Sequence, residues 1–153
     1  MKFIALFIAS AAWLAAADPT GFGQWKGAEL KEAAKKLAPK IDQKKLASEA
    51  LASYGNHSLS LIHREGSGEA ELHETQADIF IVESGEATLV VGGTVVEPKT
   101  TAPNEIRGPS IKDGISKHLG PGDIVHVAAK TPHQVKIAAG KQFTYAIVKV
   151  DTP

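Results

Sequence analysis

Two short stretches of the sequence carry side chains that could bind a metal ion together. Glu71 and His73 are two residues apart, and Asp78 comes just before an apolar run. Residues two apart in an extended segment project from the same face, so Glu71 and His73 can converge on one point. Much later in the chain, His133 follows Pro132, which fixes the backbone φ just before the ring. Two imidazoles with one or two carboxylates suit Mn, Fe, Ni, Zn or Cu.

The first stretch resembles a sequence motif of the cupin superfamily, which reads G-x5-H-x-H-x3–4-E-x6-G. Six residues separate Asp78 from Gly85, as they separate the family's Glu from its Gly. Four residues separate His73 from Asp78, so His73 takes the position of the second histidine. Glu71 then takes the position of the first.

The second stretch resembles the second cupin motif, which reads G-x5-P-x-G-x2-H-x3-N. The spacing fits from Gly122 to His133, which places His133 at the ligand position of that motif. The other positions differ, because Ala128, Lys130 and Ile137 stand where the family has Pro, Gly and Asn.

The first motif also departs from the family pattern. Glu71 replaces a histidine, Asp78 replaces a glutamate, and Glu65 occupies the position of the opening glycine. A rival register would make His73 the first histidine and would put Thr75 at the second. We prefer the register with Glu71 because it places two potential ligands on one face of the strand, whereas the rival places one ligand and a hydroxyl there.

The resemblance implies an all-β chain with the cupin-type double-stranded β-helix, a jelly-roll barrel, behind an N-terminal helical preface. It implies that Glu71, His73, Asp78 and His133 bind a divalent transition metal, which is Mn, Fe, Ni, Zn or Cu. Cupins that resemble this chain include oxygenases, decarboxylases, isomerases and lyases. In such proteins the metal uses open coordination positions to bind and polarise a small organic substrate.

Other residues are candidates for contact with a substrate. Apolar side chains on the strands of the site would form the wall that small-molecule pockets have: Phe80, Val82 and Val135. Either His126 or Tyr145 would be the partner in proton transfer. Alternatively, His126 packs against the site or supports its ligands. Arg107, on a long loop with Glu105, would bind an anionic substrate, or would belong to a solvated rim.

A second function of a different class fits the same residues. The chain would then be a non-catalytic exported cupin that binds a small ligand or sugar, or a structural dimer module. In that case His73 and His133 would be hydrogen-bonded core groups without a metal. Barrels of this type usually form homodimers, which cover sheet edges, so we expect a homodimer in either case. The remaining histidines are predicted to lie on the surface: His57, His63 and His118.

A helical preface is predicted before the β-rich part of the chain. Apolar residues at positions 30, 33, 34 and 37 have helical spacing and predict a helix that ends before Pro39. Apolar residues at positions 47, 50, 51 and 54 predict a second helix, with Asp42 as its N-cap and Gly55 at its end.

From His57 onward the chain changes to short runs of β-forming residues separated by Gly, Pro and Asp. We predict strands at 57–64, 70–73, 78–83, 86–91, 94–97, 116–119, 123–127, 133–138 and 142–150. The segment 98–114 has little periodicity and predicts a long loop, either a functional flap or a disordered excursion. The predicted organisation is therefore a signal peptide at 1–17, a helical segment at 18–54 and the cupin barrel at 55–153.

Composition limits the compartment and the partners. The N-terminus has Lys2, an apolar run, and an A-x-A pattern at Ala15 and Ala17, as in a cleaved signal peptide. We therefore expect a periplasmic or secreted protein with no stable membrane association after cleavage. The chain has no cysteine, which excludes disulfides and thiolate sites. Its 17 basic and 17 acidic residues form no basic stripe, so nucleic acid is not an expected partner. The expected ligand is a small molecule.

Overall fold

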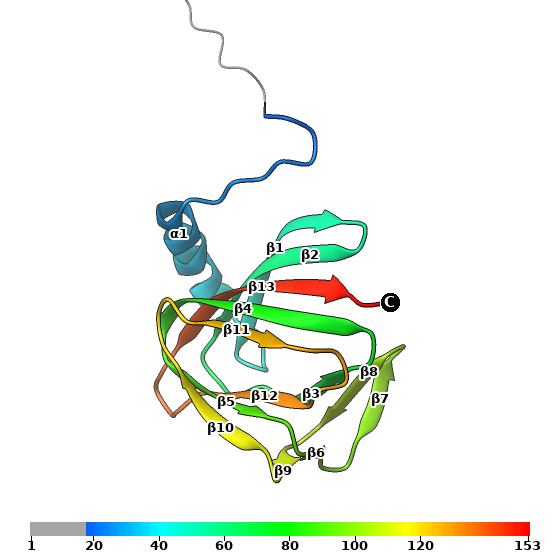
Figure 1. Ribbon diagram of the computed structural model, residues 1–153. Coiled ribbons are helices and arrows are strands. Elements are labelled where there is room, and N and C mark those ends of the chain that lie inside the picture. Colours follow the sequence, from blue (N-terminus) through cyan, green and yellow to red (C-terminus); the bar gives the residue numbers. More distant parts are fainter. Residues whose placement is uncertain (1–17) are drawn as a thin grey trace, which may run out of the picture.

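A computed structural model describes residues 18–153, and two facing β-sheets form its body (Figure 1). The strands of the first sheet, in spatial order, are β1 (Leu46–Tyr54), β2 (His57–Arg64), β13 (Phe143–Asp151), β4 (Gln76–Gly85) and β11 (Ile124–Val127). Those of the second are β10 (Ile115–Leu119), β5 (Ala87–Val91), β12 (His133–Lys136), β3 (Ala70–His73), β8 (Glu105–Gly108) and β7 (Lys99–Ala102). Strands β6 (Thr94–Val95) and β9 (Ile111–Lys112) form a small third sheet. The predicted all-β class is confirmed.

The core lies between the two large sheets. Alternate side chains of the strands that form the core point inward, in keeping with the two-residue period of a strand. On β4 the inward residues include Phe80 and Val82, which pack in one cluster with Leu89 of β5 and with Phe143 and Tyr145 of β13. The buried sides of strands far apart in the sequence therefore meet in one barrel interior.

The first predicted helix is confirmed as α1 (Gly27–Leu37), and the short 3-10 helix η1 (Ala38–Lys40) follows it. The apolar face of α1 covers the outer side of the first sheet, where Leu37 packs with Ala47 of β1 and Leu61 of β2. This second cluster anchors the helix outside the barrel and away from its interior. Within residues 18–153, no helix is long and apolar enough to cross a membrane.

The second predicted helix is wrong, because residues 46–54 form strand β1. Strand β1 pairs with β2 through the two-residue turn Gly55-Asn56, and Gly55 has the positive φ of 55° that such turns need. Asp42 does not cap a helix; its side chain accepts hydrogen bonds from the N–H groups of Lys44 and Leu46 in a turn. A bulge between Ala50 and Ala52 interrupts the pairing, so the apolar residues of β1 do not keep a simple alternation. The barrel therefore begins near residue 46, ahead of the predicted boundary at 55.

The long loop predicted at 98–114 is also wrong. Strands β7 and β8 form a hairpin there, and β8 pairs with β3, so that Glu105 lies opposite His73 and Arg107 lies opposite Glu71. The side chains of β7 are all exposed, so this strand lacks the apolar alternation by which strands are recognised. The hairpin extends the second sheet and brings two charged residues to the site.

Candidate metal centre

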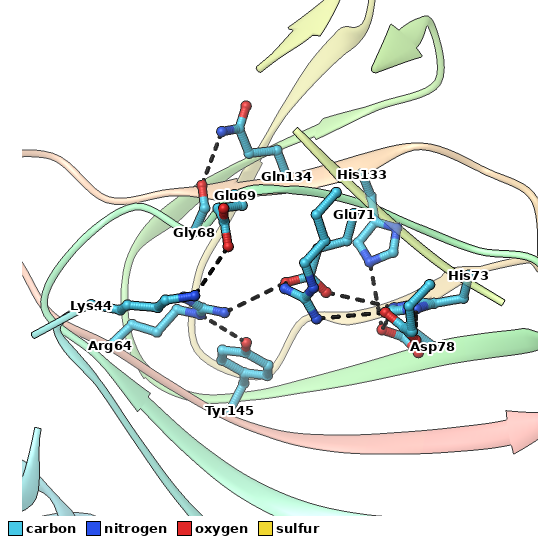
Figure 2. Close-up of polar contacts among 12 residues, drawn as sticks. Lys44, Arg64, Gly68, Glu69, Glu71, His73, Asp78, His133, Gln134 and Tyr145 are labelled. Carbon is cyan, nitrogen blue, oxygen red and sulfur yellow. Dashed lines mark hydrogen bonds and ion pairs between the residues drawn. The ribbon is translucent and has the colours of Figure 1, made fainter. Parts of the chain in front are cut away.

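The predicted ligands meet inside the barrel beside a cavity of about 210 Å³. Figure 2 shows the side chains of Glu71, His73, Asp78 and His133 pointing toward one another. Glu71 and His73 lie on β3, and His133 of β12 pairs directly with Glu71. One ligand atom each from Glu71, His73 and His133 lies within 4.8 Å of the other two. The register of two neighbouring strands therefore brings together residues that are far apart in the sequence.

The hydrogen bonds of the two rings assign the same tautomer to both histidines. The Nδ1 atom of His133 lies 3.1 Å from the carbonyl oxygen of Thr131, which can only accept, so Nδ1 carries the proton. The Nδ1 atom of His73 lies 2.5 Å from a carboxylate oxygen of Glu105, which also accepts. In the neutral rings, both Nε2 atoms therefore offer a lone pair to the centre. Metal-binding histidines usually have this arrangement.

The Nε2 atom of His133 has no hydrogen-bond partner among residues 18–153, although it is buried. Its nearest charged neighbour is Oδ2 of Asp78, at 3.5 Å. Buried polar atoms in folded proteins nearly always have a partner, so an orphaned one needs an explanation. A metal ion bound at this nitrogen would supply it.

Asp78 lies beside the two rings but is held by another residue. Both of its carboxylate oxygens accept hydrogen bonds from Nζ of Lys149, at 2.9 and 3.1 Å. The same Nζ lies 3.0 Å from Nε2 of His73. Lys149 on β13 is directly opposite Asp78 on β4, so the strand register places the ammonium group among the predicted ligands. Asp78 is not one of the three residues whose ligand atoms converge within 4.8 Å.

The charges of this cluster shift two pKa values. Burial raises the pKa of Asp78, but the adjacent rings of His133 and His73 and the charge of Lys149 outweigh burial and hold it well below its usual range. Burial lowers the pKa of His73, but the hydrogen bond to Asp78 and the charges of Asp78 and Glu105 raise it overall. Nε2 of His73 has different partners in its two states. When neutral it accepts from Lys149, and when protonated it donates to Oδ2 of Asp78, 3.3 Å away.

Two arginines border the site on its outer side. Nε of Arg64 donates to the hydroxyl oxygen of Tyr145 at 3.2 Å, and its Nη2 lies 4.0 Å from Glu71 (Figure 2). Nη1 of Arg107 donates to Glu71 at 2.8 Å, and its Nη2 lies 3.5 Å from Glu105. Both arginines also line an outer cavity of about 520 Å³. Burial raises the pKa of Tyr145, against the opposing charge of Arg64.

The other predicted site residues have mixed outcomes. Phe80, Val135 and Tyr145 line the inner cavity, whereas Val82 is buried in the core and does not line it. Arg107 lines both cavities, although it lies on strand β8 and not on the predicted loop. The prediction that His126 lies at the site is wrong, because this residue is exposed on β11, where alternate residues face outward.

The structure also shows the positions of Thr75, which the rival register needs, and of His63, which was predicted to lie on the surface. Thr75 is exposed in the turn after β3, so it does not share the face of His73, as Glu71 does. The prediction of a surface position for His63 is wrong, because the residue is buried and its Nδ1 lies 2.8 Å from the hydroxyl of Thr144. Glu105 and Lys149 both contact His73, and sequence reasoning missed these two contacts. Both depend on strand register, which the sequence does not display.

Comparison with known proteins identifies the fold. No family model matches the sequence, and no curated protein matches it. Among solved structures, TT1209 from Thermus thermophilus has 18% sequence identity and a TM-score of 0.54, over 78% of this chain and 94% of that one. An uncharacterized conserved protein with a double-stranded β-helix domain, from Klebsiella pneumoniae, has 17% identity and a TM-score of 0.53, over 74% and 86%.

A third similar structure carries an enzyme name. A putative mannose-6-phosphate isomerase from Ralstonia eutropha has 18% identity and a TM-score of 0.51, over 73% of this chain and 90% of that one. At these identities the likeness concerns the fold, and it agrees with the two facing sheets described above. The chain therefore has the double-stranded β-helix fold, which is the fold that the motif resemblance predicts.

Proposed function

We propose that this protein is a metal-binding cupin that acts on a small organic molecule in its barrel. The observation that carries the proposal is the buried Nε2 of His133, which has no hydrogen-bond partner among residues 18–153. Ligand atoms of Glu71, His73 and His133 lie within 4.8 Å of one another. Two imidazole nitrogens and a carboxylate oxygen form a donor set that Mn, Fe, Ni, Zn and Cu accept. Glu105 and the Thr131 carbonyl hold the two rings in the orientation that such binding needs.

A bound metal of this kind would act as a Lewis acid on a substrate oxygen. The chain's own residues would bind and orient the substrate. Phe80, Val135 and Ile147 supply an apolar wall to the inner cavity. Its volume of about 210 Å³ suits a small molecule and is below the usual range for drug-sized ligands.

The arginines favour an anionic substrate, such as a carboxylate. Arg64 is largely buried and makes one hydrogen bond within residues 18–153, to Tyr145, so several of its N–H groups are available to a ligand. Arg107 lies at the outer cavity with one N–H group engaged by Glu71. Tyr145 has a raised pKa, which keeps its hydroxyl protonated at neutral pH. Because this hydroxyl accepts a hydrogen bond from Arg64, its own O–H would be free to donate one to the substrate.

A second function has one specific observation in its favour. Lys149 places an ammonium group between Asp78 and His73, so the site contains a cation of its own. In a barrel that binds a small ligand without catalysis and without a metal, Lys149 would be the only cation that this site requires.

Metal analysis distinguishes the two functions. The protein is purified without a histidine tag, its metal content is measured, and the experiment is repeated with the variant His73→Ala/His133→Ala. The proposal expects a stoichiometric transition metal in the wild type and its loss in the variant, with both folded. The matched control is His118→Ala, an exposed histidine on β10 that should leave the metal content unchanged. A wild type that stays metal-free after incubation with each of the five metals would contradict the proposal.

We also propose export and a homodimer. Export is inferred from residues 1–17, which lie outside the described part of the chain, and is tested by locating the protein in cell fractions. The homodimer is supported by two exposed isoleucines on edge strands, Ile115 of β10 and Ile124 of β11, which are 63% and 71% exposed. A second copy would cover these edges. A single monomer peak in size exclusion with light scattering would contradict it.

A further inference from the structure

Lys149 belongs to neither sequence motif, yet its ammonium group lies among the predicted metal ligands. Its side chain comes from β13, crosses to β4 and ends with Nζ within 3.1 Å of three atoms: both carboxylate oxygens of Asp78 and Nε2 of His73. All three are acceptors, and an ammonium group has three N–H donors and no acceptor. The contacts of this ammonium group are therefore satisfied by the same two residues that the sequence predicts as metal ligands.

A metal ion and Lys149 cannot both use His73. The neutral ring has one lone pair at Nε2, because its proton is held at Nδ1 by Glu105. In the structure that lone pair accepts a hydrogen bond from Lys149, at 3.0 Å. Coordination of a metal at Nε2 would require this hydrogen bond to break. The two states of His73 are therefore mutually exclusive.

Asp78 makes the competition stronger. Its side chain is only 3% exposed, and a buried carboxylate needs a cation or several hydrogen bonds to remain charged. Lys149 provides that cation here. Once a divalent cation is bound at the neighbouring nitrogens, it compensates the same charge, and a nearby ammonium group then becomes a repelling neighbour. The Lys149 side chain is 30% exposed and has a flexible four-carbon stem, so it has a route toward solvent.

We propose that Lys149 is a built-in cation that competes with the metal for His73 and Asp78 and thereby weakens metal binding. The inference rests on the proposed metal site at Glu71, His73 and His133. It adds that Lys149 fills the site in the metal-free protein and withdraws when the metal binds. It also adds that Asp78 becomes available to the metal only after this withdrawal.

The test is a metal titration of the variant Lys149→Met, which keeps most of the length of the stem and removes the charge. Zn²⁺ and Mn²⁺ are titrated in calorimetry and in competition with a chelating dye. We expect the variant to bind metal at least about tenfold more tightly than the wild type, as loss of one charge-assisted hydrogen bond predicts. Thermal unfolding provides a second readout: without metal the variant should melt below the wild type, and saturating metal should raise its melting temperature by more.

A matched pair keeps the test decisive if Lys149→Met does not fold without metal. In the background Asp78→Asn the buried carboxylate is gone, so Asp78→Asn and Asp78→Asn/Lys149→Met should both fold. The double variant should still bind metal more tightly, because the His73 lone pair is freed. Lys117→Met, at an exposed position on β10, is the control and should match the wild type.

Two outcomes would overturn the inference in different ways. Equal metal affinity with and without Lys149, in both backgrounds, would show that the ammonium group does not compete, and the proposed metal site would stand. Absence of metal binding in every one of these proteins would remove the metal site itself, and the inference with it.

Discussion

Two buried histidines on opposite sides of the barrel wall differ in a way that separates structural from functional burial. His63 and His133 are each 3% exposed. His63 lies on the outer face of β2, on the side where α1 packs, and both ring nitrogens have partners: Thr144 at 2.8 Å and Glu65 at 3.5 Å. His133 points into the barrel, and its Nε2 has no partner among residues 18–153.

Burial alone therefore does not identify a histidine that binds a metal. A buried histidine with both nitrogens engaged is a complete structural element, because all of its polar atoms are satisfied by protein. A buried histidine with one satisfied nitrogen and one free lone pair is prepared for something else to bind. The following variants test whether this distinction holds.

The largest effect is expected on metal affinity when His133 is removed. The variant His133→Ala should lose at least about 100-fold in metal affinity, because only two of the three ligand residues remain. His63→Ala, in the same assay, should bind metal like the wild type. Dye competition measures both. Equal losses in the two variants would mean that the difference in hydrogen bonding has no functional meaning.

The next largest effect is expected at Glu105, which holds Nδ1 of His73. The variant Glu105→Gln should lose about 10-fold to 100-fold in metal affinity, the usual range for a residue that orients a ligating histidine. The fold should be kept, since the side chain is partly exposed. Glu69→Gln, at an exposed position beside Lys44, is the matched control. An unchanged affinity in Glu105→Gln would remove the orienting role.

A smaller effect, on stability alone, is expected at His63. The variant His63→Ala should lower the free energy of unfolding by about 1–3 kcal/mol, because it creates a void and leaves the Thr144 hydroxyl without its partner. Denaturant unfolding at neutral pH measures the change. If this variant keeps its stability while its metal affinity falls, His63 is a functional residue, and the structural role assigned to it is wrong.

The smallest effect is expected at Tyr145, whose hydroxyl is engaged inside the barrel by Arg64. The variant Tyr145→Phe should lower the free energy of unfolding by about 1 kcal/mol and leave metal affinity unchanged. It should lower turnover once a substrate is known, since the hydroxyl is the proposed donor. A loss of metal affinity in this variant would place Tyr145 closer to the metal than the structure does.

The sequence predicts correctly those strands and site residues whose pattern lies within one short segment of the chain. Strands β3 and β4 follow from alternation and apolar runs, and the meeting of Glu71 and His73 follows from two residues on one strand. The family spacing places His133. Strand β1 reads as a helix in the sequence because its alanine-rich composition and its bulge hide the two-residue period. The Gly55-Asn56 turn is the signal that could have corrected this prediction.

The rest of the site depends on contacts that sequence order does not show. Lys149 reaches Asp78 because β13 pairs with β4, and Glu105 reaches His73 because β8 pairs with β3. The register of β8 with β3 cannot be read from the pattern of β7 and β8, whose side chains are mostly exposed or half-buried. The convergence of Glu71, His73 and His133 was therefore foreseeable from residue types and spacing, whereas the contacts of Glu105 and Lys149 with His73 were not.

The central claim is that Glu71, His73 and His133 form a metal site, and anomalous diffraction from crystals soaked with Zn²⁺ or Mn²⁺ tests it most directly. We predict one strong anomalous peak within bonding distance of Nε2 of His73 and Nε2 of His133, with the Lys149 side chain turned away from His73. A soaked crystal with no peak there, and with Lys149 still bound to His73 and Asp78, would contradict the account.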